Sequence, residues 1–341
     1  MNRVTVITDE AVTVPGGIEG ERLLVDISHL AEATGWEYKA EGLCRDEICV
    51  PVRNPTALDA GGAVDIAVLA GFLGRRCVMA HDVAIAAMAL DASDRRGALE
   101  SLRAPDLAVP DLDGNMHRLS ETTGTKRLVV AFTSWCGCRY DLPGWQALAD
   151  ELGGSLAVVA VALDDDPEAV RLFTSNITIP VLLDRQHVLS ELYAVSNVPT
   201  VIWIDEYGTI VRPNGLAFGT DTFADFTGMA SAPHLDALRR WVLDGVLPLK
   251  PVEAAGAVAD LSDDKIDARL HFRIGIQARR DGLTEAAQRH LRRAGELAPM
   301  DFSVRRAAMP MLGVDPFGQS FLDLYQERQS IGAPYHGLSP D

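Results

Sequence analysis

From about Leu128 onward, apolar runs of strand type alternate with segments of helical spacing, and this alternation limits the fold more than any other feature. The runs RLVVAFTSW, SLAVVAVALD, IPVLLD and TVIWID have the length and continuous apolar character of buried strands. Between and after them, PGWQALADEL, DPEAVRLFTS, RQHVLSELYAV and HLDALRRWVLDGV have helical spacing. Strands that alternate with helices favour a sheet with crossover helices, so the sequence predicts an α/β domain, which we place at 104–250.

Two further domains are expected on either side of this one. Residues 1–103 predict a small α/β unit with a short helix that ends at Gly35, two strands joined by a turn at 45–48, and alanine-rich helical segments. The proline-containing break RAPDLAVPDLDGN follows this unit. A proline-alanine linker, LPLKPVEAAGAVAD, ends the central domain, and we expect residues 251–341 to form the remainder of this linker and an all-α domain.

The helical domain carries the spacing of small and large residues that is typical of one tetratricopeptide repeat. Its pattern includes Gly275, Ala278, Ala287, Leu291 and Pro299. A single repeat cannot bury its own faces, so it must pack on another surface. We expect a helical hairpin that caps the central domain, and the alternative is a groove that binds a partner peptide.

Charge and apolar patterning restrict the partners and the compartment. The formal net charge of −17 argues against nucleic acid as the main partner, because phosphate binding needs clustered cations. No apolar run approaches the roughly 18 residues of a membrane span, and the first residues lack the pattern of a signal peptide. We therefore expect a cytoplasmic protein without a membrane partner. Thiols are held reduced there, so paired cysteines are expected to be catalytic or metal-binding.

The segment TSWCGCRYDLP places two cysteines, Cys136 and Cys138, at the turn between a strand and a helix. A cysteine at a helix start is exposed to the positive end of the helix dipole, which favours the thiolate. We therefore predict that Cys136 is the nucleophile and that Cys138 is the resolving thiol. Gly137 allows the short turn between them. The alternatives are a zinc half-site, which would need two more ligands, and two inert core residues.

Four segments of the chain resemble the TlpA/ResA-like branch of the thioredoxin fold, which is related to the AhpC/TSA redoxins. These segments are APDLAVPDLDGN, WCGCRYDLP, NVPT and TVIWIDEYGTIV, within 104–246. The resemblance implies that Trp135 flanks the nucleophile and that a cis peptide bond between Val198 and Pro199 faces it. The chain departs from the family in having one residue between the cysteines instead of two.

The CGC turn is also similar to redoxin relatives that carry selenocysteine, glycine and cysteine at these positions. Thr133 lies three residues before Cys136, where peroxidatic redoxins place threonine, but Val129 stands where those proteins have proline. This likeness adds a peroxidase to the possible activities.

An acid–base partner and an anion-stabilising cation are expected near the dithiol. Asp141 lies one helical turn after Cys138, where related proteins often carry an acid. A buried carboxylate with a raised pKa can relay a proton; the alternative is a solvated acid that the helix dipole favours. Asp164, at the end of the next strand, competes for the role. Arg139 is a candidate for holding a thiolate or sulfenate.

The remaining paired cysteines, Cys44 and Cys49, lie on either side of an expected four-residue loop, so their side chains can meet across a hairpin. Three interpretations remain open. The two cysteines form a second redox pair that exchanges electrons with the CGC dithiol, they join Cys77, His29 or His81 in a metal site, or they are buried apolar residues.

Together these features predict an α/β protein with a central thioredoxin-like fold, a small N-terminal α/β unit and a C-terminal tetratricopeptide-like helical region. The expected activity is that of a thiol-disulfide oxidoreductase without cofactor or metal. Its expected substrate is a disulfide-bonded protein or a small thiol or peroxide, and a cellular thiol reductant such as a thioredoxin system would regenerate it. The alternatives are a peroxiredoxin-like thiol peroxidase and a non-catalytic, redox-sensing adaptor.

Overall fold

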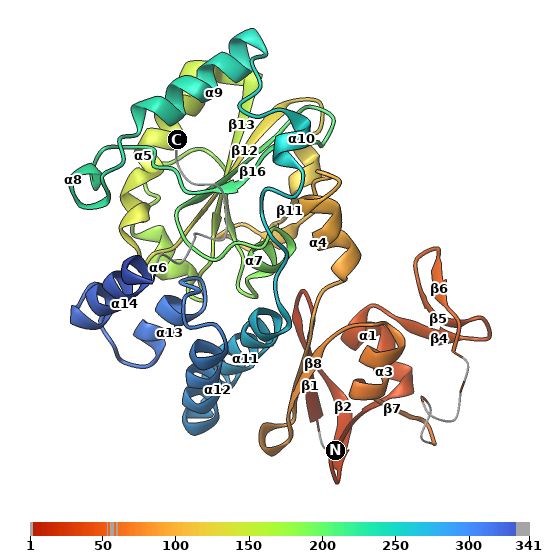
Figure 1. The fold of residues 1–341 in the computed structure, drawn as a ribbon. Helices are drawn as coiled ribbons and strands as arrows, with labels where there is room; N and C mark the ends of the chain where they lie inside the picture. Colours follow the sequence, from red (N-terminus) through yellow and green to blue (C-terminus); the bar gives the residue numbers. More distant parts are fainter. Residues whose placement is uncertain (1–2, 53, 55–57, 59–60, 332–341) are drawn as a thin grey trace. The chain divides into compact units, whose positions relative to one another are not determined.

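The computed structural model describes residues 3–52, 54, 58 and 61–331, and the chain forms two compact units (Figure 1). Unit 1 comprises Met1–Ala92 and Ser262–Pro299, and unit 2 comprises Ser93–Leu261 and Met300–Asp341. This division differs from three consecutive domains at 1–103, 104–250 and 251–341, because the C-terminal helical region is shared between the two units. None of the helices in the described part of the chain has the length and apolar character that crossing a membrane requires.

Unit 1 is built on a six-stranded sheet of order β7-β3-β2-β1-β9-β8. β1 pairs in parallel with β9, and the other neighbours are antiparallel. The strands are β1 (Arg3–Ile7), β2 (Ala11–Glu19), β3 (Arg22–Asp26), β7 (Ala63–Asp65), β8 (Cys77–Ala80) and β9 (Ile85–Met88). The helices α1 (Leu30–Thr34) and α3 (Ile66–Phe72) add apolar residues to the core of this sheet. The N-terminal unit is therefore α/β. The two strands expected on either side of the turn at 45–48 are present as β5 (Gly42–Arg45) and β6 (Ile48–Val50) of a separate small sheet, whereas the six-stranded sheet was not expected.

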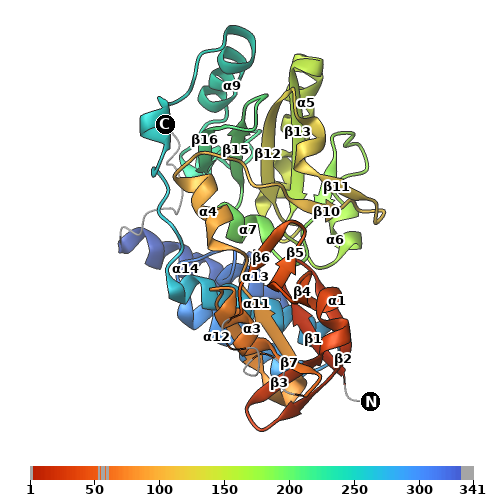
Figure 2. The same ribbon diagram turned by 90° about the vertical axis from the view of Figure 1, so that its right-hand side faces the viewer.

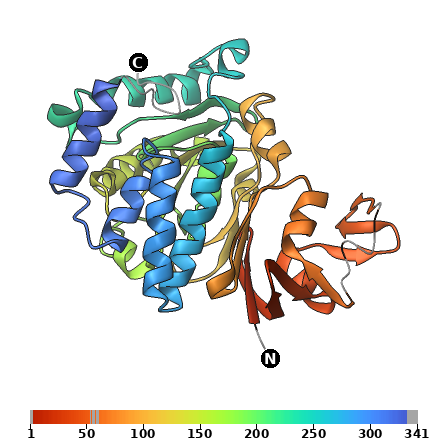
Figure 3. The same cartoon turned by 60° about the horizontal axis from the view of Figure 1, so that its bottom comes forward.

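The helical hairpin that we expected from the spacing of small and large residues belongs to unit 1. It consists of α11 (Asp263–Arg280) and α12 (Thr284–Leu297), which lie side by side (Figure 3). Gly275 of α11 lies against Leu291 of α12, at a distance where a Cβ atom would be 2.7 Å from the leucine Cγ. α11 packs on β8 and β9. α11 thus packs on the N-terminal sheet, and the hairpin shares unit 1 with that sheet instead of forming one domain with the rest of 251–341, as we expected.

Unit 2 contains the predicted alternation of strands and helices. Its sheet has the order β14-β13-β12-β15-β16 (Figure 2), with the first three strands parallel and the last two antiparallel. The strands are β12 (Lys126–Phe132), β13 (Leu156–Ala162), β14 (Val181–Leu183), β15 (Thr200–Ile204) and β16 (Ile210–Gly215). The helices are α4 (Ala92–Leu99), α5 (Leu142–Leu152), α6 (Pro167–Arg171), α7 (Val188–Leu192), α8 (Ala224–Thr227), α9 (Ala232–Asp244) and α10 (Pro251–Ala254). A short ribbon, β10 (Ala108–Pro110) and β11 (Met116–Arg118), precedes the sheet.

The last described part of the chain, 300–331, completes unit 2 with α13 (Arg305–Met311) and α14 (Gln319–Ser330). Its own small core contains Phe302, Met309, Phe321 and Leu324. The backbone N–H of Phe302 donates to the carbonyl of Ser196 at 2.8 Å, which joins this segment to the loop before β15. The segment is therefore part of the thioredoxin-like unit, although it follows the hairpin of unit 1 in the chain.

Candidate active site

The two cysteines lie where the sequence predicts them, at the turn between β12 and α5. Cys136 precedes a short 3-10 helix, Gly137–Asp141, which leads directly into α5. Both side chains are buried: 5% of Cys136 and 3% of Cys138 is exposed. The bond between Val198 and Pro199 is cis, and the Cys136 Sγ lies 3.8 Å from the Val198 carbonyl oxygen. The structure thus brings the dithiol and the proline loop together, in the arrangement that the family resemblance implies.

An arginine from the C-terminal segment contacts the first cysteine. The guanidinium of Arg306, in α13, donates a hydrogen bond to the Cys136 Sγ at 3.5 Å. It also donates to the Pro316 carbonyl at 3.1 and 3.2 Å and lies 3.7 Å above the Phe321 ring, with Trp135 5.7 Å away. These contacts hold a buried cation against the sulfur. Sequence reasoning missed this residue, because 170 positions separate it from the cysteine and no motif marks it.

The surroundings make the two thiols different. A hydrogen bond from the Cys138 thiol and the positive charge of Arg306 lower the pKa of Cys136 to about 6, although burial opposes this shift. For Cys138, burial is the largest effect and raises the pKa of the thiol well above its ordinary value. At neutral pH, Cys136 therefore carries the thiolate and Cys138 the proton.

Asp141 is buried below the dithiol instead of lying in solvent at the first helical turn. Only 1% of it is exposed, and burial raises its pKa to about 6. Thr220 donates to its Oδ1 through the backbone N–H at 3.0 Å and the hydroxyl at 2.7 Å. Its Oδ2 has no hydrogen-bond partner in the described part of the chain. One carboxylate oxygen is thus free to take a proton.

The other polar candidates lie behind the active-site turn. Asp164 accepts hydrogen bonds from the N–H and the hydroxyl of Ser134, at 2.7 and 2.6 Å, and burial raises its pKa to about 7. Thr133 is fully buried, and its hydroxyl has no partner among the described residues. Arg139 donates to the Ser134 carbonyl and stacks on Phe173. Arg139 therefore supports the backbone of the turn, and Arg306 occupies the place beside the sulfur that we expected Arg139 to take.

A cavity of about 370 Å³ lies beside the dithiol, within unit 2. Its walls come from the active-site turn, the cis-proline loop, the chain between β16 and α9, and the C-terminal segment. The lining residues are Cys136, Gly137, Cys138, Asn197, Val198, Pro199, Leu216, Phe218, Phe223, Phe226, Thr227, Met229, Phe302, Arg306, Phe317, Phe321, Leu322 and Tyr325.

The chain between β16 and α9, residues 216–231, packs directly on the active-site turn, and we call it the insertion. A Cβ atom on Gly137 would lie 2.6 Å from the ring of Phe223, so a larger residue between the two cysteines would require this ring to move. A Cβ atom on Gly144 would lie 2.0 Å from the carbonyl oxygen of Gly219. Glycines thus allow the insertion to approach α5 closely and to form one wall of the cavity.

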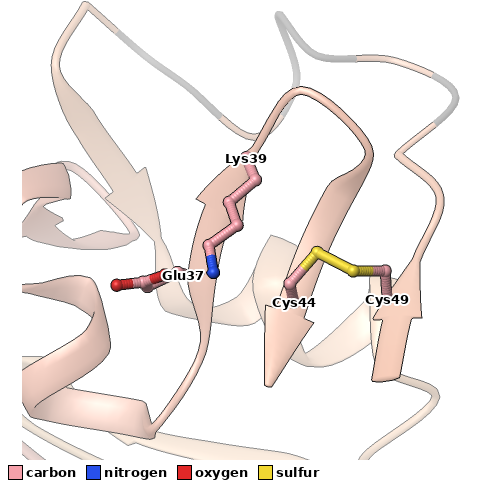
Figure 4. Close-up of a disulfide and its surroundings, with 4 residues drawn as sticks. All are labelled: Glu37, Lys39, Cys44 and Cys49. Carbon is pink, nitrogen blue, oxygen red and sulfur yellow. Dashed lines mark ion pairs between the residues drawn. A yellow bond between two sulfur atoms is a disulfide. The ribbon is translucent and has the colours of Figure 1, made fainter. Parts of the chain in front are cut away.

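The second cysteine pair forms a disulfide in unit 1 (Figure 4). Cys44 on β5 (Gly42–Arg45) faces Cys49 on β6 (Ile48–Val50), and β4 (Glu37–Lys39) completes the small sheet. Cys44 is buried, and Cys49 is exposed. Both sulfurs are used in the bond, so the interpretations as metal ligands and as free apolar residues are wrong. The described residues contain no cluster of three or more potential metal ligands.

Comparison with known proteins places the central segment in a family. Residues 101–212 match the model of the AhpC/TSA family. The chain is 33% identical over 120 residues to Thioredoxin-like protein YneN of Bacillus subtilis, which covers 33% of this chain and 70% of that protein. It is 26% identical over 140 residues to Thiol-disulfide oxidoreductase ResA of Geobacillus thermodenitrificans, with coverage of 40% and 76%.

Among solved structures, the exposed lipoprotein thioredoxin Etrx1 of Streptococcus pneumoniae is 26% identical, with 40% of this chain and 99% of that chain covered and a TM-score of 0.33. The family match ends before the insertion and before α13, so the cavity walls that these two parts form, Arg306 included, lie outside it. The dithiol turn and the cis-proline loop lie inside it. The chain therefore belongs to the AhpC/TSA family as a ResA-like redoxin with a thioredoxin fold, and it is a thiol-disulfide oxidoreductase.

Proposed function

We propose that Cys136 is the attacking thiolate and Cys138 the resolving thiol of this oxidoreductase. The observation that carries the proposal is the contact of Arg306 with the Cys136 Sγ, together with the hydrogen bond from Cys138. Both interactions stabilise negative charge on one sulfur only. The thiolate is the nucleophile in thiol–disulfide exchange, so the two cysteines take different roles.

In the first step, the Cys136 thiolate attacks one sulfur of a substrate disulfide. A bond forms between these two sulfurs, the substrate S–S bond breaks, and the other half of the substrate leaves as a thiolate. Cys138 then loses its proton and attacks the Cys136 Sγ. This releases the second half of the substrate as a thiolate and leaves a Cys136–Cys138 disulfide. The substrate gains two electrons and the protein dithiol loses two.

Asp141 is the proton acceptor for the resolving step in this mechanism. Its unpartnered Oδ2 is buried near the dithiol, and its pKa of about 6 lets it be ionised at neutral pH and still take up a proton. The hydrogen bonds from Thr220 fix the orientation of the carboxylate. This geometry favours Asp141 over Asp164, both of whose oxygens accept hydrogen bonds from Ser134.

For the cellular setting, we propose a cytoplasmic protein whose oxidised dithiol is reduced by a cellular thiol system such as that of thioredoxin. Disulfides in the cytoplasm are usually transient and redox-active. On this proposal the Cys44–Cys49 bond exchanges electrons as well, and the exposed Cys49 sulfur is the one open to attack. To test this, the thiols of cells held under different redox conditions are trapped with an alkylating agent at low pH. A Cys44–Cys49 bond that stayed oxidised under all of these conditions would contradict the proposal.

A peroxidase is the second candidate, and the unpartnered hydroxyl of Thr133 favours it because Thr133 precedes Cys136 by three residues. In that reaction the Cys136 thiolate attacks a peroxide oxygen and the O–O bond breaks. The other oxygen leaves as hydroxide or alkoxide and takes up a proton, and a sulfenic acid forms on Cys136. Cys138 then condenses with the sulfenic acid and water is released. The first step therefore distinguishes the two activities, since only the peroxidase forms a sulfenic acid.

The test divides anaerobically reduced protein between stoichiometric hydrogen peroxide and a disulfide, and follows the cysteine peptides by time-resolved mass spectrometry. We expect a mixed disulfide on Cys136 within the disulfide sample, followed by the Cys136–Cys138 bond. Cys138→Ser should stop the reaction at the mixed disulfide, and Cys136→Ser should prevent it. Cys77 is a free thiol in unit 1, and its substitution provides the matched control. The Cys77→Ser variant should react as the parent does.

Three outcomes would contradict the proposal. A fast sulfenic acid on Cys136 with no mixed disulfide would make the protein a peroxidase. A mixed disulfide that forms first on Cys138 would exchange the roles of the two thiols. Unchanged function of Cys136→Ser in cells would favour a redox-sensing adaptor.

A further inference from the structure

The cavity beside the dithiol limits which disulfides can reach the nucleophile. Only 5% of Cys136 is exposed, and the sulfur contributes to the cavity wall. A substrate must therefore place one of its sulfurs inside the cavity before exchange can occur. A disulfide on the surface of a folded protein is held by two stretches of backbone, which need a wide groove. The cavity, at about 370 Å³, has the size typical of a site for a small molecule.

The lining determines what kind of small group fits. The lining residues that come from the insertion and the C-terminal segment are mainly aromatic and aliphatic: Leu216, Phe218, Phe223, Phe226, Met229, Phe302, Phe317, Phe321, Leu322 and Tyr325. Arg306 is the one charged side chain among the lining residues, and it already donates to the Cys136 Sγ and to the Pro316 carbonyl. A charged group on the substrate would lose its hydration without a new partner, which is costly. An apolar group gains free energy by the same transfer.

Several apolar side chains at the cavity are partly exposed, which provides an entrance. The exposed fractions are 50% for Phe226, 44% for Phe317 and 36% for Leu322. Two of these residues lie in the C-terminal segment and one in α8 of the insertion. Neither part lies within the stretch that matches the family, so the family match alone does not predict this cavity.

We propose that the substrate of this site is a low-molecular-weight disulfide, one half of which is an apolar group that fills the cavity. The proposal rests on the exchange function above. With the apolar half bound, its sulfur lies next to the Cys136 thiolate, which attacks it; the other half leaves as a thiolate. Cys138 gives its proton to Asp141 and attacks the Cys136 Sγ, and the apolar half leaves as a thiolate that takes up a proton.

The experiment measures the second-order rate constant of the reduced, full-length protein with mixed disulfides of 2-mercaptoethanol and straight-chain alkanethiols from methyl to hexyl. Full burial of one methylene group in the transition state corresponds to about a fourfold increase in the rate constant. We expect the rate constant to rise by about this factor for each added methylene until the cavity is full, and then to level off. Dithiothreitol, which has no cavity, gives the intrinsic reactivity of each disulfide and corrects for it.

Two matched variants link the gain to the cavity. Leu322→Gln makes part of the entrance polar and should reduce the gain per methylene. Leu243→Gln introduces the same change at a residue of α9 that is 66% exposed and does not line the cavity, and it should retain the gain. Folding of both variants is checked by circular dichroism, and Phe226→Gln serves in place of Leu322→Gln if that variant fails to fold.

A rate constant that does not change with chain length would overturn the proposal and leave the exchange function intact. So would a faster reaction with the disulfides of folded ribonuclease A than with the hexyl compound. An equal loss of the gain in Leu243→Gln would overturn the assignment to the cavity. No reaction with any disulfide, the methyl compound included, would overturn the exchange function and the proposal with it.

Discussion

At the scale of single residues, two identical thiols become chemically different through their neighbours. The hydrogen bonds from Cys138 and Arg306 lower the pKa of Cys136 to about 6, and burial raises that of Cys138. A low pKa has two effects in exchange. It supplies thiolate at neutral pH, and it makes the Cys136 sulfur a better leaving group when a reducing thiol attacks Cys138 of the oxidised pair. A residue from a distant part of the chain, Arg306, thus contributes to the difference between the two thiols.

We predict that Arg306→Gln raises the pKa of Cys136, because the variant loses the positive charge that stabilises the thiolate. The alkylation rate of Cys136, measured against pH with iodoacetamide, should rise through a midpoint near pH 6 in the parent and through a higher midpoint in the variant. A charge-assisted hydrogen bond is worth about 1.5–3 kcal/mol, so the rate at pH 6 should fall about tenfold or more.

Arg305 provides the matched control for this prediction. It is the preceding residue of α13, and its guanidinium pairs with Glu327, 3.3 Å away, instead of with the sulfur. Arg305→Gln should therefore keep the parent pH profile. A midpoint in Arg306→Gln that equals the parent value would show that the arginine does not stabilise the thiolate.

For Asp141→Asn we predict that the resolving step slows by about a hundredfold, the low end of what a general base contributes. The first step should not slow, so the mixed disulfide on Cys136 accumulates. In the parent, the rate of resolution should rise through pH 6 as the carboxylic acid ionises, and this rise should be lost in the variant. Stopped-flow mixing followed by acid quench and mass spectrometry separates the two steps.

Thr220→Val distinguishes a proton acceptor from a purely structural acid. It removes the hydroxyl that donates to Asp141 at 2.7 Å and keeps the carboxylate. This hydrogen bond lowers the carboxyl pKa, so its loss should move the midpoint of the resolving step to higher pH. Resolution in Asp141→Asn that is as fast and as pH-dependent as in the parent would remove Asp141 from the mechanism.

The residues of the dithiol turn could be predicted because their chemistry is contained in a few consecutive positions. A short motif just after a buried strand contains Cys136 and Cys138. Another, just before a buried strand, contains Val198 and Pro199. Arg306 is recognised only through a contact between distant segments, and nothing in its local sequence distinguishes it from Arg305. Pairing of Cys44 with Cys49 remained one of several options, because a hairpin allows the contact but does not show the bond.

At the scale of elements, the two amphipathic helices α11 and α12 were predicted, but their place in the fold was not. Their apolar positions show which faces are buried, and they do not specify the surface that covers them. For α11 that surface is the strand pair β8 and β9, which comes almost two hundred positions earlier in the chain. Spacing of small and large residues is local information, whereas packing on a sheet edge depends on the whole unit.

We predict that Gly275→Ala lowers the free energy of unfolding of unit 1 relative to Gly71→Ala. Both substitutions remove a helical glycine of this unit, and each gains up to about 1 kcal/mol of helix propensity. The added Cβ would lie 2.7 Å from Leu291 in the first case and meets no atom within 4 Å in the second. Overpacking costs about 1–3 kcal/mol, and this is the expected difference between the variants.

The difference is measured in urea through alkylation of Cys77, a thiol of unit 1 whose pKa burial raises to about 12 in the folded state. Unfolding exposes the thiol and lets its pKa return toward the ordinary value, so alkylation becomes fast. Equal midpoints for the two glycine variants would show that α11 and α12 have room to separate, and the close contact at Gly275 would then not limit their packing.

At the scale of the whole molecule, the chain enters each unit twice. It leaves unit 1 after Ala92, returns at Ser262 for the helical hairpin, and re-enters unit 2 at Met300 with the segment that carries Arg306. Division of a sequence at composition changes assumes that each domain is one continuous stretch, which is why the three predicted domains differ from the two units. The arginine that contacts the Cys136 sulfur thus comes only after the chain has completed the hairpin of unit 1.

Because the units have separate cores, we predict that removal of the Cys44–Cys49 bond destabilises unit 1 alone. The bond closes a short loop, for which the chain-entropy model gives about 2 kcal/mol. The free energy of unfolding changes by about 1–3 kcal/mol per molar urea. The Cys44→Ser, Cys49→Ser double variant should therefore move the Cys77 alkylation transition to a urea concentration that is lower by about 1 M.

Tryptophan fluorescence reports mainly unit 2, which holds Trp135, Trp145, Trp203 and Trp241, whereas Trp36 lies in unit 1. Its transition should stay at the parent urea concentration, whereas equal shifts of both signals would mean that the two units unfold as one.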